Sequence, residues 1–276
     1  MKVGYLGPKG TFTEAAAHLL SKDGEFIPYD SFSDALKAVD RGEIDEAIVP
    51  IENSIEGIVN GTVDSLIFDV NLYIKELLIM PINQCLIAKN NIKLEEIKEV
   101  LSHSHALPQC KSYLNNNLSG VKLTSTSSTA EAIKKVALSD DKIAGIGSKY
   151  AAKLYNLNII EEDIQDTNTN FTQFIKVTKE PTLVYNLDMV SLCFSTADTP
   201  GSLYKLLDIF SIFDINLSKI SSRPMKNRPM EYVFLVDLDV NNNANDIKDA
   251  LNLIERKTTF CKNLGCYNII DNRLQK

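Results

Sequence analysis

Two patterns in the sequence predict an α/β domain followed by a smaller α+β domain of ferredoxin-like topology. Short apolar runs alternate with amphipathic helical segments up to about residue 160, which favours layers built on mainly parallel strands. Beyond residue 188 the order becomes strand, helix, strand, strand, helix, strand. The 276 residues suffice for two domains, each with its own core.

The first domain opens with a strand and a capped helix. Thr11 and Glu14 form a capping box at the start of the helix that runs to Leu20, and Gly24 is well placed to end it. Ser128 and Glu131 form a second capping box. The other expected elements are strands at 3–6, 47–49, 121–126 and 174–177, and helices at 33–40 and 61–68.

A joint is expected at residues 181–187, because the pattern changes there. The strand at 189–195 alternates apolar and small polar residues, and Pro200 suits the first turn of the next helix. The remaining elements are strands at 216–222, 231–238 and 266–270, and a helix at 246–256. They complete the βαββαβ order.

The composition excludes several classes of function. The net charge of -7, with a pI of about 5.1 and no dense basic run, argues against a nucleic-acid partner. The N-terminal segment lacks the long apolar stretch of a signal peptide, and no segment approaches the ~20 apolar residues that span a bilayer. Five scattered cysteines without a CxxC pair predict free thiols in a reducing cytosol, and their spacing to histidines is not that of a zinc site.

Four polar clusters follow strands, where open α/β sheets bind ligands. On spacing alone each also fits a local turn or helix cap. Cys110, near two histidines, is interpreted as a buried helix residue rather than a thiolate nucleophile. The clusters are Gly7-Pro8-Lys9-Gly10-Thr11-Phe12-Thr13, Pro50-Ile51-Glu52-Asn53-Ser54-Ile55-Glu56-Gly57, Ser102-His103-Ser104-His105-Ala106-Leu107-Pro108-Gln109-Cys110 and Asp166-Thr167-Asn168-Thr169-Asn170-Phe171-Thr172-Gln173-Phe174.

Together these clusters resemble the motifs of the prephenate dehydratase family, in the right order and over nearly the whole chain. The most diagnostic stretch is Val49-Pro50-Ile51-Glu52-Asn53-Ser54, and Thr172-Gln173-Phe174 fills the place of the Thr-Arg-Phe motif. Ile146-Gly147-Ser148 resembles a further motif. Gly201-Ser202-Leu203-Tyr204 and the stretch from Asn216 to Pro224 resemble the two effector motifs of an ACT regulatory domain.

The resemblance implies an architecture and an activity. Residues 1–182 would form a two-lobed catalytic domain like a type II periplasmic binding protein, with lobes split near 80 and 160, and residues 188–276 an ACT domain. The activity would be conversion of prephenate to phenylpyruvate, water and carbon dioxide, without cofactor or metal, in phenylalanine biosynthesis. L-phenylalanine would bind between paired ACT domains of a homodimer or homotetramer and lower activity.

The resemblance also implies roles for individual residues. Thr172 would serve the leaving hydroxyl, and Glu52 either acts as an acid or braces its loop. The implied catalytic residues are Thr172, Glu52, Asn53 and Ser102; the substrate-binding residues are Thr11, Ser54, Gln109, Asn170, Gln173 and Phe174; the effector-binding residues are Gly201, Ser202, Leu203, Asn216, Leu217, Ser222 and Arg223.

Three positions depart from the family pattern. Gln173 replaces the usual Arg, which weakens the expected hold on a substrate carboxylate unless Lys9 or a helix N-terminus supplies positive field. His105 replaces a usual Gln, and Ser221 replaces the Glu of the second effector motif. Two alternatives therefore stay open, an arogenate dehydratase and a non-catalytic amino-acid-binding regulator. A tethered chorismate mutase is not expected.

Overall fold

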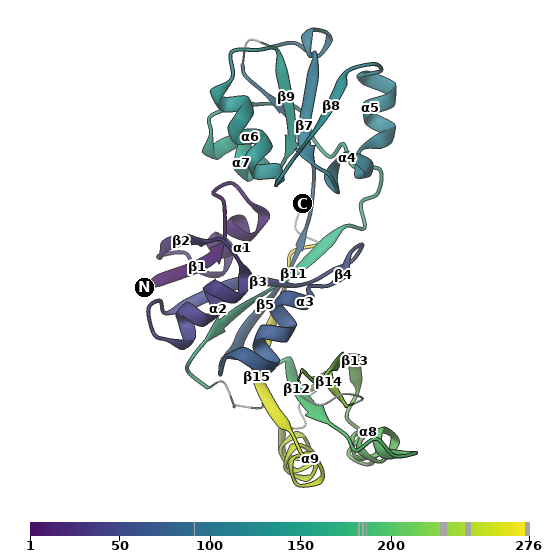
Figure 1. The fold of residues 1–276 in the computed structure, drawn as a ribbon. Coiled ribbons are helices and arrows are strands. Elements are labelled where there is room, and N and C mark those ends of the chain that lie inside the picture. Colours follow the sequence, from purple (N-terminus) through teal and green to yellow (C-terminus); the bar gives the residue numbers. More distant parts are fainter. Residues whose placement is uncertain are drawn as a thin grey trace.

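The computed structural model describes residues 1–90, 92–181, 183, 185, 187–226, 231–240 and 244–273, which fold into three packed units (Figure 1). Lobe 1 combines the N-terminal strands with a strand that returns at 171–178, and lobe 2 holds the strands between residues 85 and 161. The C-terminal domain begins with a strand at residue 189. Within the described residues, every helix is too short or too polar to cross a membrane.

Lobe 1 is a twisted sheet covered on both faces. Its elements are β1 Lys2–Leu6, α1 Phe12–Leu20, β2 Glu25–Tyr29, α2 Phe32–Asp40, β3 Glu46–Asn53, β4 Gly57–Ile58, α3 Asn60–Asp64, the π-helical turn η1 Ser65–Asp69, β5 Tyr73–Pro81 and β11 Phe171–Thr178. The main strand order is β2-β1-β3-β11-β5. Helix α1 packs on one face around the buried rings of Tyr5 and Phe174, whereas α2 and α3 cover the other face.

The helix caps of lobe 1 follow the sequence. Thr11 accepts from the backbone N–H of Glu14, as the capping box predicts. The Glu14 carboxylate, however, accepts from the N–H of Gly10 at 2.6 Å rather than from that of Thr11, and it also accepts from the Tyr5 hydroxyl at 2.9 Å. Because Glu14 is only 4% exposed, these bonds fix the loop between β1 and α1.

Lobe 2 repeats the layered plan. Its elements are β6 Cys85–Ala88, the 3₁₀ turn η2 Leu94–Glu96, β7 Glu99–His103, α4 Ala106–Gln109, α5 Lys111–Asn117, β8 Lys122–Thr126, α6 Thr129–Leu138, β9 Ile143–Gly147, α7 Lys149–Leu154 and β10 Asn158–Glu161. The strand order is β10-β6-β9-β7-β8. A Cβ at Gly145 or Gly147 would lie 2.7 Å from Ile133, so these glycines let α6 pack closely on β9.

The chain crosses between the lobes twice, at residues 82–84 and 164–170, and the two crossing segments lie side by side. The Ile82 N–H donates to the Asn170 carbonyl at 2.9 Å, and the Ile164 N–H donates to the Gln84 carbonyl at 3.0 Å. The two-lobed α/β fold that the resemblance implies is thus confirmed. The expectation of mainly parallel strands holds for only part of each lobe. Strand β1 pairs in parallel with β2 and β3, and β7 pairs in parallel with β8 and β9, whereas β11 and β6 are antiparallel to their neighbours within the lobes.

The C-terminal domain has the expected βαββαβ order. Its elements are β12 Met189–Ser195, α8 Ser202–Ile212, β13 Leu217–Pro224, β14 Tyr232–Asp239, α9 Ala244–Lys257 and β15 Cys261–Asp271. The sheet order β13-β14-β12-β15, with helices α8 and α9 on one face, is the ferredoxin-like arrangement. Positions 182, 184 and 186 of the expected joint lie outside the described residues.

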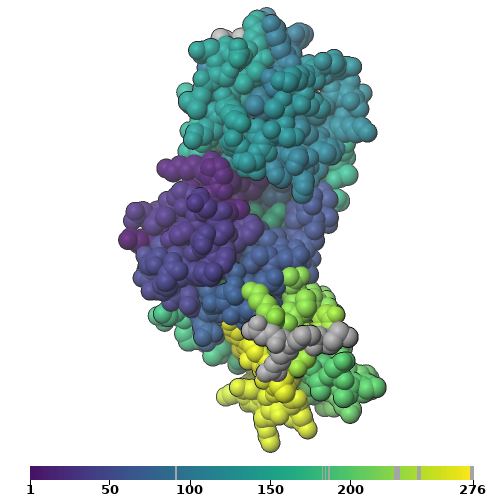
Figure 2. Space-filling model, viewed as in Figure 1, coloured from purple at the N-terminus to yellow at the C-terminus, as the bar shows by residue number. Residues whose placement is uncertain are grey.

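The other face of this C-terminal sheet packs on lobe 1. Val233, Leu235 and Tyr267 join the lobe 1 core that also contains Leu66 and Ile175. Strand β15 is longer than expected, and its last residues pair in parallel with β5, from Asn268 opposite Glu76 to Asp271 opposite Ile79. The C-terminal domain is therefore continuous with the sheet of lobe 1, and their surfaces abut in Figure 2.

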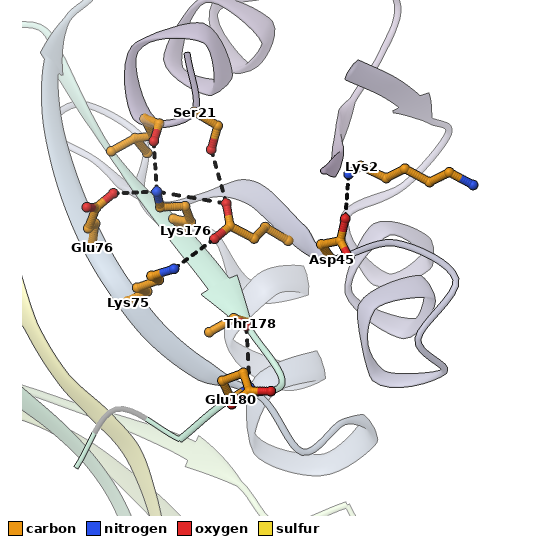
Figure 3. A network of polar contacts seen from close by, with 10 residues as sticks. Lys2, Ser21, Asp45, Lys75, Glu76, Lys176, Thr178 and Glu180 are labelled. Carbon is orange, nitrogen blue, oxygen red and sulfur yellow. Dashed lines mark hydrogen bonds and ion pairs between the residues drawn. The ribbon is translucent and has the colours of Figure 1, made fainter. Parts of the chain in front are cut away.

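A buried ionic network ties β11 to its neighbours at the Lys176 end (Figure 3). Lys176 Nζ lies 2.7 Å from Glu76 Oε2 and 3.8 Å from Glu46 Oε2, and it donates to the Leu20 carbonyl at 2.7 Å. Glu46 also accepts from Ser21 Oγ and Lys75 Nζ, each at 3.1 Å. The Lys176 and Glu46 side chains are 8% and 6% exposed, so these charges are held by each other rather than by water.

Candidate active site

The centre of the site is a pair of side chains on neighbouring strands. Asn53 at the end of β3 lies directly opposite Thr172 on β11, and its Nδ2 donates to Thr172 Oγ1 at 2.9 Å. Asn53 Oδ1 accepts from the N–H groups of Ile55 and Glu56 at 2.9 Å, which fixes the amide orientation. Both residues were expected in loops. They lie in strands instead, because β3 and β11 pair with each other as far as Asn53 and Thr172.

This geometry leaves the Thr172 proton available. A hydroxyl carries one donor and two acceptor sites, and Asn53 occupies one acceptor site of Thr172. Within the described residues, no group accepts the Thr172 hydroxyl proton. Thr172 is 8% exposed, so a bound molecule would receive that hydrogen bond in a largely water-excluded setting.

A hydrogen-bond chain carries the site across to lobe 2. Asn53 Nδ2 also contacts Asn170 Oδ1 at 2.9 Å, and Asn170 Nδ2 donates to Gln109 Oε1 at 3.2 Å. The Gln109 carbonyl accepts from the Asp166 N–H at 2.6 Å. The structure thus brings together Thr172, Asn53, Asn170 and Gln109, four of the residues implied by the resemblance, at the boundary between the lobes.

Two other residues implied by the resemblance, Ser54 and Phe174, stabilise the strand that carries Thr172. Ser54 Oγ donates to the Thr169 carbonyl at 2.8 Å and accepts from the Phe171 N–H at 3.0 Å, which braces the start of β11. Phe174 is 2% exposed in the core beneath α1, so it packs rather than faces a ligand. The sequence resemblance placed it among substrate-binding residues, but burial in the lobe 1 core assigns it a packing role.

Thr11 and Ser102 have their hydroxyls engaged within their own lobes. Thr11 Oγ1 donates to the Leu6 carbonyl at 3.1 Å while it caps α1. Ser102, fully buried in β7, donates to the Ile146 carbonyl at 2.8 Å. Neither hydroxyl joins the hydrogen-bond chain that contains Thr172.

Glu52 and Gln173 lie on the reverse side of the sheet from Asn53 and Thr172. They are direct partners in the β3–β11 ladder, and such partners project to the same face. Glu52 Oε2 accepts from Lys219 Nζ of β13 at 2.5 Å. The resemblance implied a catalytic role for Glu52 and substrate binding by Gln173, but strand alternation turns both side chains away from Thr172 and toward the C-terminal domain.

Sequence reasoning gave no role to two residues at the lobe boundary. Ser148 caps α7, and its Oγ lies 3.5 Å from the Gly10 carbonyl of lobe 1. Tyr150 and Ser148, with Phe12 and Met80, line a cavity of about 220 Å³ between α1 and α7. Met80 lies opposite Thr172 in the β5–β11 ladder, so this cavity borders the site. The Ile146-Gly147-Ser148 motif was the available signal.

The cysteine and histidines near Gln109 serve other purposes. Cys110 is fully buried, and burial raises the pKa of its thiol to about 12, so it stays protonated near neutral pH. His105 Nδ1 lies 3.4 Å from Glu56 Oε1 of lobe 1. Burial, and then the neighbouring His105, lower the pKa of His103.

The implied effector residues divide into two groups. Gly201, Ser202 and Leu203 line a cavity of about 310 Å³ with Tyr232 and Phe234. Gly201 has φ +77°, which favours glycine at this helix start. In contrast, the other four residues lie on β13 or just before it, outside this cavity's lining: Asn216, Leu217, Ser222 and Arg223.

Asn216 and Arg223 each have a specific partner. Asn216 Nδ2 donates to Asp239 Oδ2 at 2.5 Å, within the C-terminal domain. Arg223 forms a bidentate pair with Asp64 of lobe 1, at 2.7 and 2.8 Å, and donates to Asn60 Oδ1 at 2.7 Å. The structure therefore places Arg223 against lobe 1, outside the lining of the cavity that contains Gly201.

Comparisons with known proteins identify the family to which the chain belongs. The profile of the family described as prephenate dehydratase matches residues 3–182. The prephenate dehydratase of Methanocaldococcus jannaschii is 39% identical over 97% of this chain and 98% of its own length. An Arabidopsis thaliana protein named arogenate dehydratase/prephenate dehydratase 2 is 34% identical over 98% of this chain and 73% of its own.

A solved structure extends the likeness to three dimensions. The Arthrobacter aurescens prephenate dehydratase in complex with L-Phe is 34% identical and superposes with a TM-score of 0.85, covering 97% of this chain and 90% of the other. The family match covers more than half of the chain, and the structural match includes both lobes and the C-terminal domain. The chain therefore belongs to the prephenate dehydratase family of lyases.

Proposed function

We propose that this chain converts prephenate to phenylpyruvate, and that Thr172 donates a hydrogen bond to the leaving ring hydroxyl. The observation that carries this proposal is the fixed Asn53 amide, which occupies an acceptor site of Thr172 and leaves the threonine proton directed to a ligand. A threonine hydroxyl is a weak acid, so its role is to orient and stabilise the departing oxygen rather than to release a free proton.

The neutral character of the cluster suits the reaction. Prephenate loses its ring hydroxyl as water and one carboxylate as carbon dioxide, while the electrons of the broken C–C bond enter the ring and make it aromatic. Asn53, Asn170 and Gln109 offer amide hydrogen bonds without a strong positive charge. Such a site can orient the substrate without strongly stabilising the departing carboxylate, which favours its loss. The reaction needs no cofactor.

The domain assignment is part of the proposal. Residues 1–182 would be the catalytic domain, with lobes divided near 80 and 160, and 188–276 an ACT domain. Support comes from lobe 2 strands that run from 85 to 161 and from the ferredoxin-like strand order after residue 189. We place the protein in the cytoplasm, in keeping with five unpaired cysteines.

Regulation by L-phenylalanine is also proposed. The cavity lined by Gly201, Ser202 and Leu203 would take part of the effector, and the Arthrobacter aurescens relative was solved with L-Phe. Strand β13 is the edge of its sheet and exposes Ile220, 43% accessible, which suits pairing of two C-terminal domains. A homodimer or homotetramer would then complete the effector site with residues such as Ser222.

The decisive experiment is phenylpyruvate formation from prephenate by purified protein, with and without L-phenylalanine. Formation that L-phenylalanine suppresses supports both the active site and the effector site. Formation indifferent to L-phenylalanine keeps the dehydratase and removes the effector assignment, with Ser221 as the first position to examine. Folded protein that does not exceed the uncatalysed rate contradicts the proposal.

Arogenate dehydratase is the second candidate, favoured by the 34% identity to the plant protein named for both activities. Rates on prephenate and arogenate, measured on one preparation, separate the two.

A non-catalytic regulator is the third candidate. The sequence feature that supported it was Gln173 in place of the usual Arg. Because Gln173 lies on the reverse face from Thr172, its difference from Arg removes no side chain from the Thr172 face, which weakens that alternative.

A further inference from the structure

Four cations of the C-terminal domain reach into one short stretch of lobe 1. Their contacts are Lys219 with Glu52, Arg223 with Asp64, Lys226 with Asp69, and Lys262 with the carbonyls of Leu66 and Val70. All of these targets lie between residues 52 and 70, the segment that surrounds and follows Asn53. The contacts of these four cations are thus concentrated on the chain that leaves the candidate site.

The pair formed by Lys219 and Glu52 differs from the other three contacts in its position. Glu52 is the covalent neighbour of Asn53 and the ladder partner of Gln173, which adjoins Thr172. The Lys219 and Glu52 side chains are 18% and 29% exposed, against 47% and 30% for Lys226 and Asp69. A charge pair shielded from water holds its geometry more firmly than an exposed pair.

Lys219 lies beside a buried polar cluster of the C-terminal domain. It lies opposite Asp237 in the β13–β14 ladder, and both side chains face lobe 1. Asp237 is 8% exposed and accepts from Ser191 Oγ at 2.5 Å, while Ser191 Oγ lies 2.7 Å from the Tyr267 hydroxyl. This buried cluster fixes the carboxylate next to the Lys219 stem, so movement of the C-terminal sheet moves Lys219 with it.

Side chains of Glu52 and Asn53 project to opposite faces of β3, and a strand transmits displacement along its backbone. If Lys219 holds Glu52, it also sets where the Asn53 amide meets Thr172 on the other face. We propose that Lys219 is a positioning residue, which acts through Glu52 to hold the Asn53–Thr172 pair in register and links the C-terminal domain to the site. This inference rests on the proposed function.

The test compares Lys219→Met with Lys226→Met. Both variants remove one cation from the same interface and keep a long apolar stem, but Asp69, the partner of Lys226, does not adjoin the site. Lys219→Met is expected to lower kcat about tenfold, within the ~10²-fold that a small misplacement can cause, with little change in KM. Lys219→Arg restores most of kcat, and Lys226→Met retains parental kcat. Equal kcat in Lys219→Met and Lys226→Met overturns the inference.

Hydrogen exchange gives a readout that does not depend on activity. Amides at residues 51–58 and 170–174 are expected to exchange faster in Lys219→Met than in Lys226→Met, because the end of β3 loses its anchor. Equal exchange in the two variants overturns the inference. An inactive parent would refute the proposed function alone, since the exchange comparison would still decide whether Lys219 positions Asn53.

Discussion

The two ends of the paired strands β3 and β11 use polar side chains in opposite ways. At one end, Glu46 and Lys176 are charged, buried and paired with other residues of lobe 1 (Figure 3). At the other end, Asn53 and Thr172 are neutral and connect to Gln109 of lobe 2. Charges satisfied inside one unit anchor the sheet, whereas neutral donors at a boundary between units remain available to a ligand.

The strongest way to break this comparison is Lys176→Met. It removes the cation that buried Glu46 shares with the partly exposed Glu76, so stability should fall by about 3 kcal/mol, the lower part of the range for a broken buried pair. Turnover per folded molecule should stay near that of the parent, because the site is at the far end of β11. Urea unfolding monitored by circular dichroism measures the loss.

Lys75→Met is the matched control for Lys176→Met. Lys75 pairs with the same Glu46 but is 49% exposed, so its removal should change stability by less than about 1 kcal/mol. Equal losses in the two variants would show that the buried position of Lys176 is irrelevant.

Thr172→Ala tests the neutral end. Loss of the hydroxyl should lower kcat by ~10²-fold or more while the thermal midpoint stays near that of the parent. Thr172→Ser should retain most of the activity. Thr178→Ala serves as the control, because Thr178 is equally buried on the same strand but at the far end. A folded Thr172→Ala enzyme within a few fold of the parent would remove Thr172 from its role.

Local features of the fold could be predicted from the sequence. The caps at Thr11 and Ser128 depend on residues three positions apart. Each hydroxyl accepts from the N–H three residues on, as the pattern indicates, although the Glu carboxylate bonds the N–H before the cap residue rather than that of the cap itself. The ferredoxin-like order after residue 188 also follows from periodicity alone. These features are set by neighbouring residues, which is why spacing sufficed.

Contacts between distant residues could not be predicted in that way. Asn53 and Thr172 are 119 positions apart. The clusters that contain them were expected to be loops, because spacing within one cluster gives no sign that it pairs with a distant strand. Lys219 and Glu52 are 167 positions apart. Alternation along β13 puts Lys219 and Arg223 on one face, but only the packed structure shows that this face meets lobe 1.

Gln109→Ala sharpens the comparison at the lobe boundary. It removes the acceptor for Asn170 Nδ2, a single hydrogen bond worth about 1 kcal/mol, so kcat/KM should fall roughly fivefold. Most of the change should appear in KM, because Gln109 joins the lobes around the substrate. Asn117→Ala, on exposed α5 of the same lobe, should leave kcat/KM unchanged. A loss confined to kcat would argue for a direct role in the chemical step.

The smallest expected effect concerns charge at the boundary. Burial and the adjacent His105 lower the pKa of His103 below its ordinary value of about 6.5, so the folded state binds fewer protons than the unfolded state near that pH. The resulting stability is present above the unfolded pKa and is lost as pH falls through it toward the folded pKa.

His103→Gln should therefore flatten the decline in thermal midpoint between about pH 7.5 and 5.5, relative to the parent. Differential scanning fluorimetry at the two pH values measures the difference. Identical declines would show that protonation of His103 is tolerated beside the lobe boundary. A smaller decline in the variant would mean that the lobe 2 side of the boundary disfavours a charge on His103, unlike the Lys176 end, where paired charges are buried.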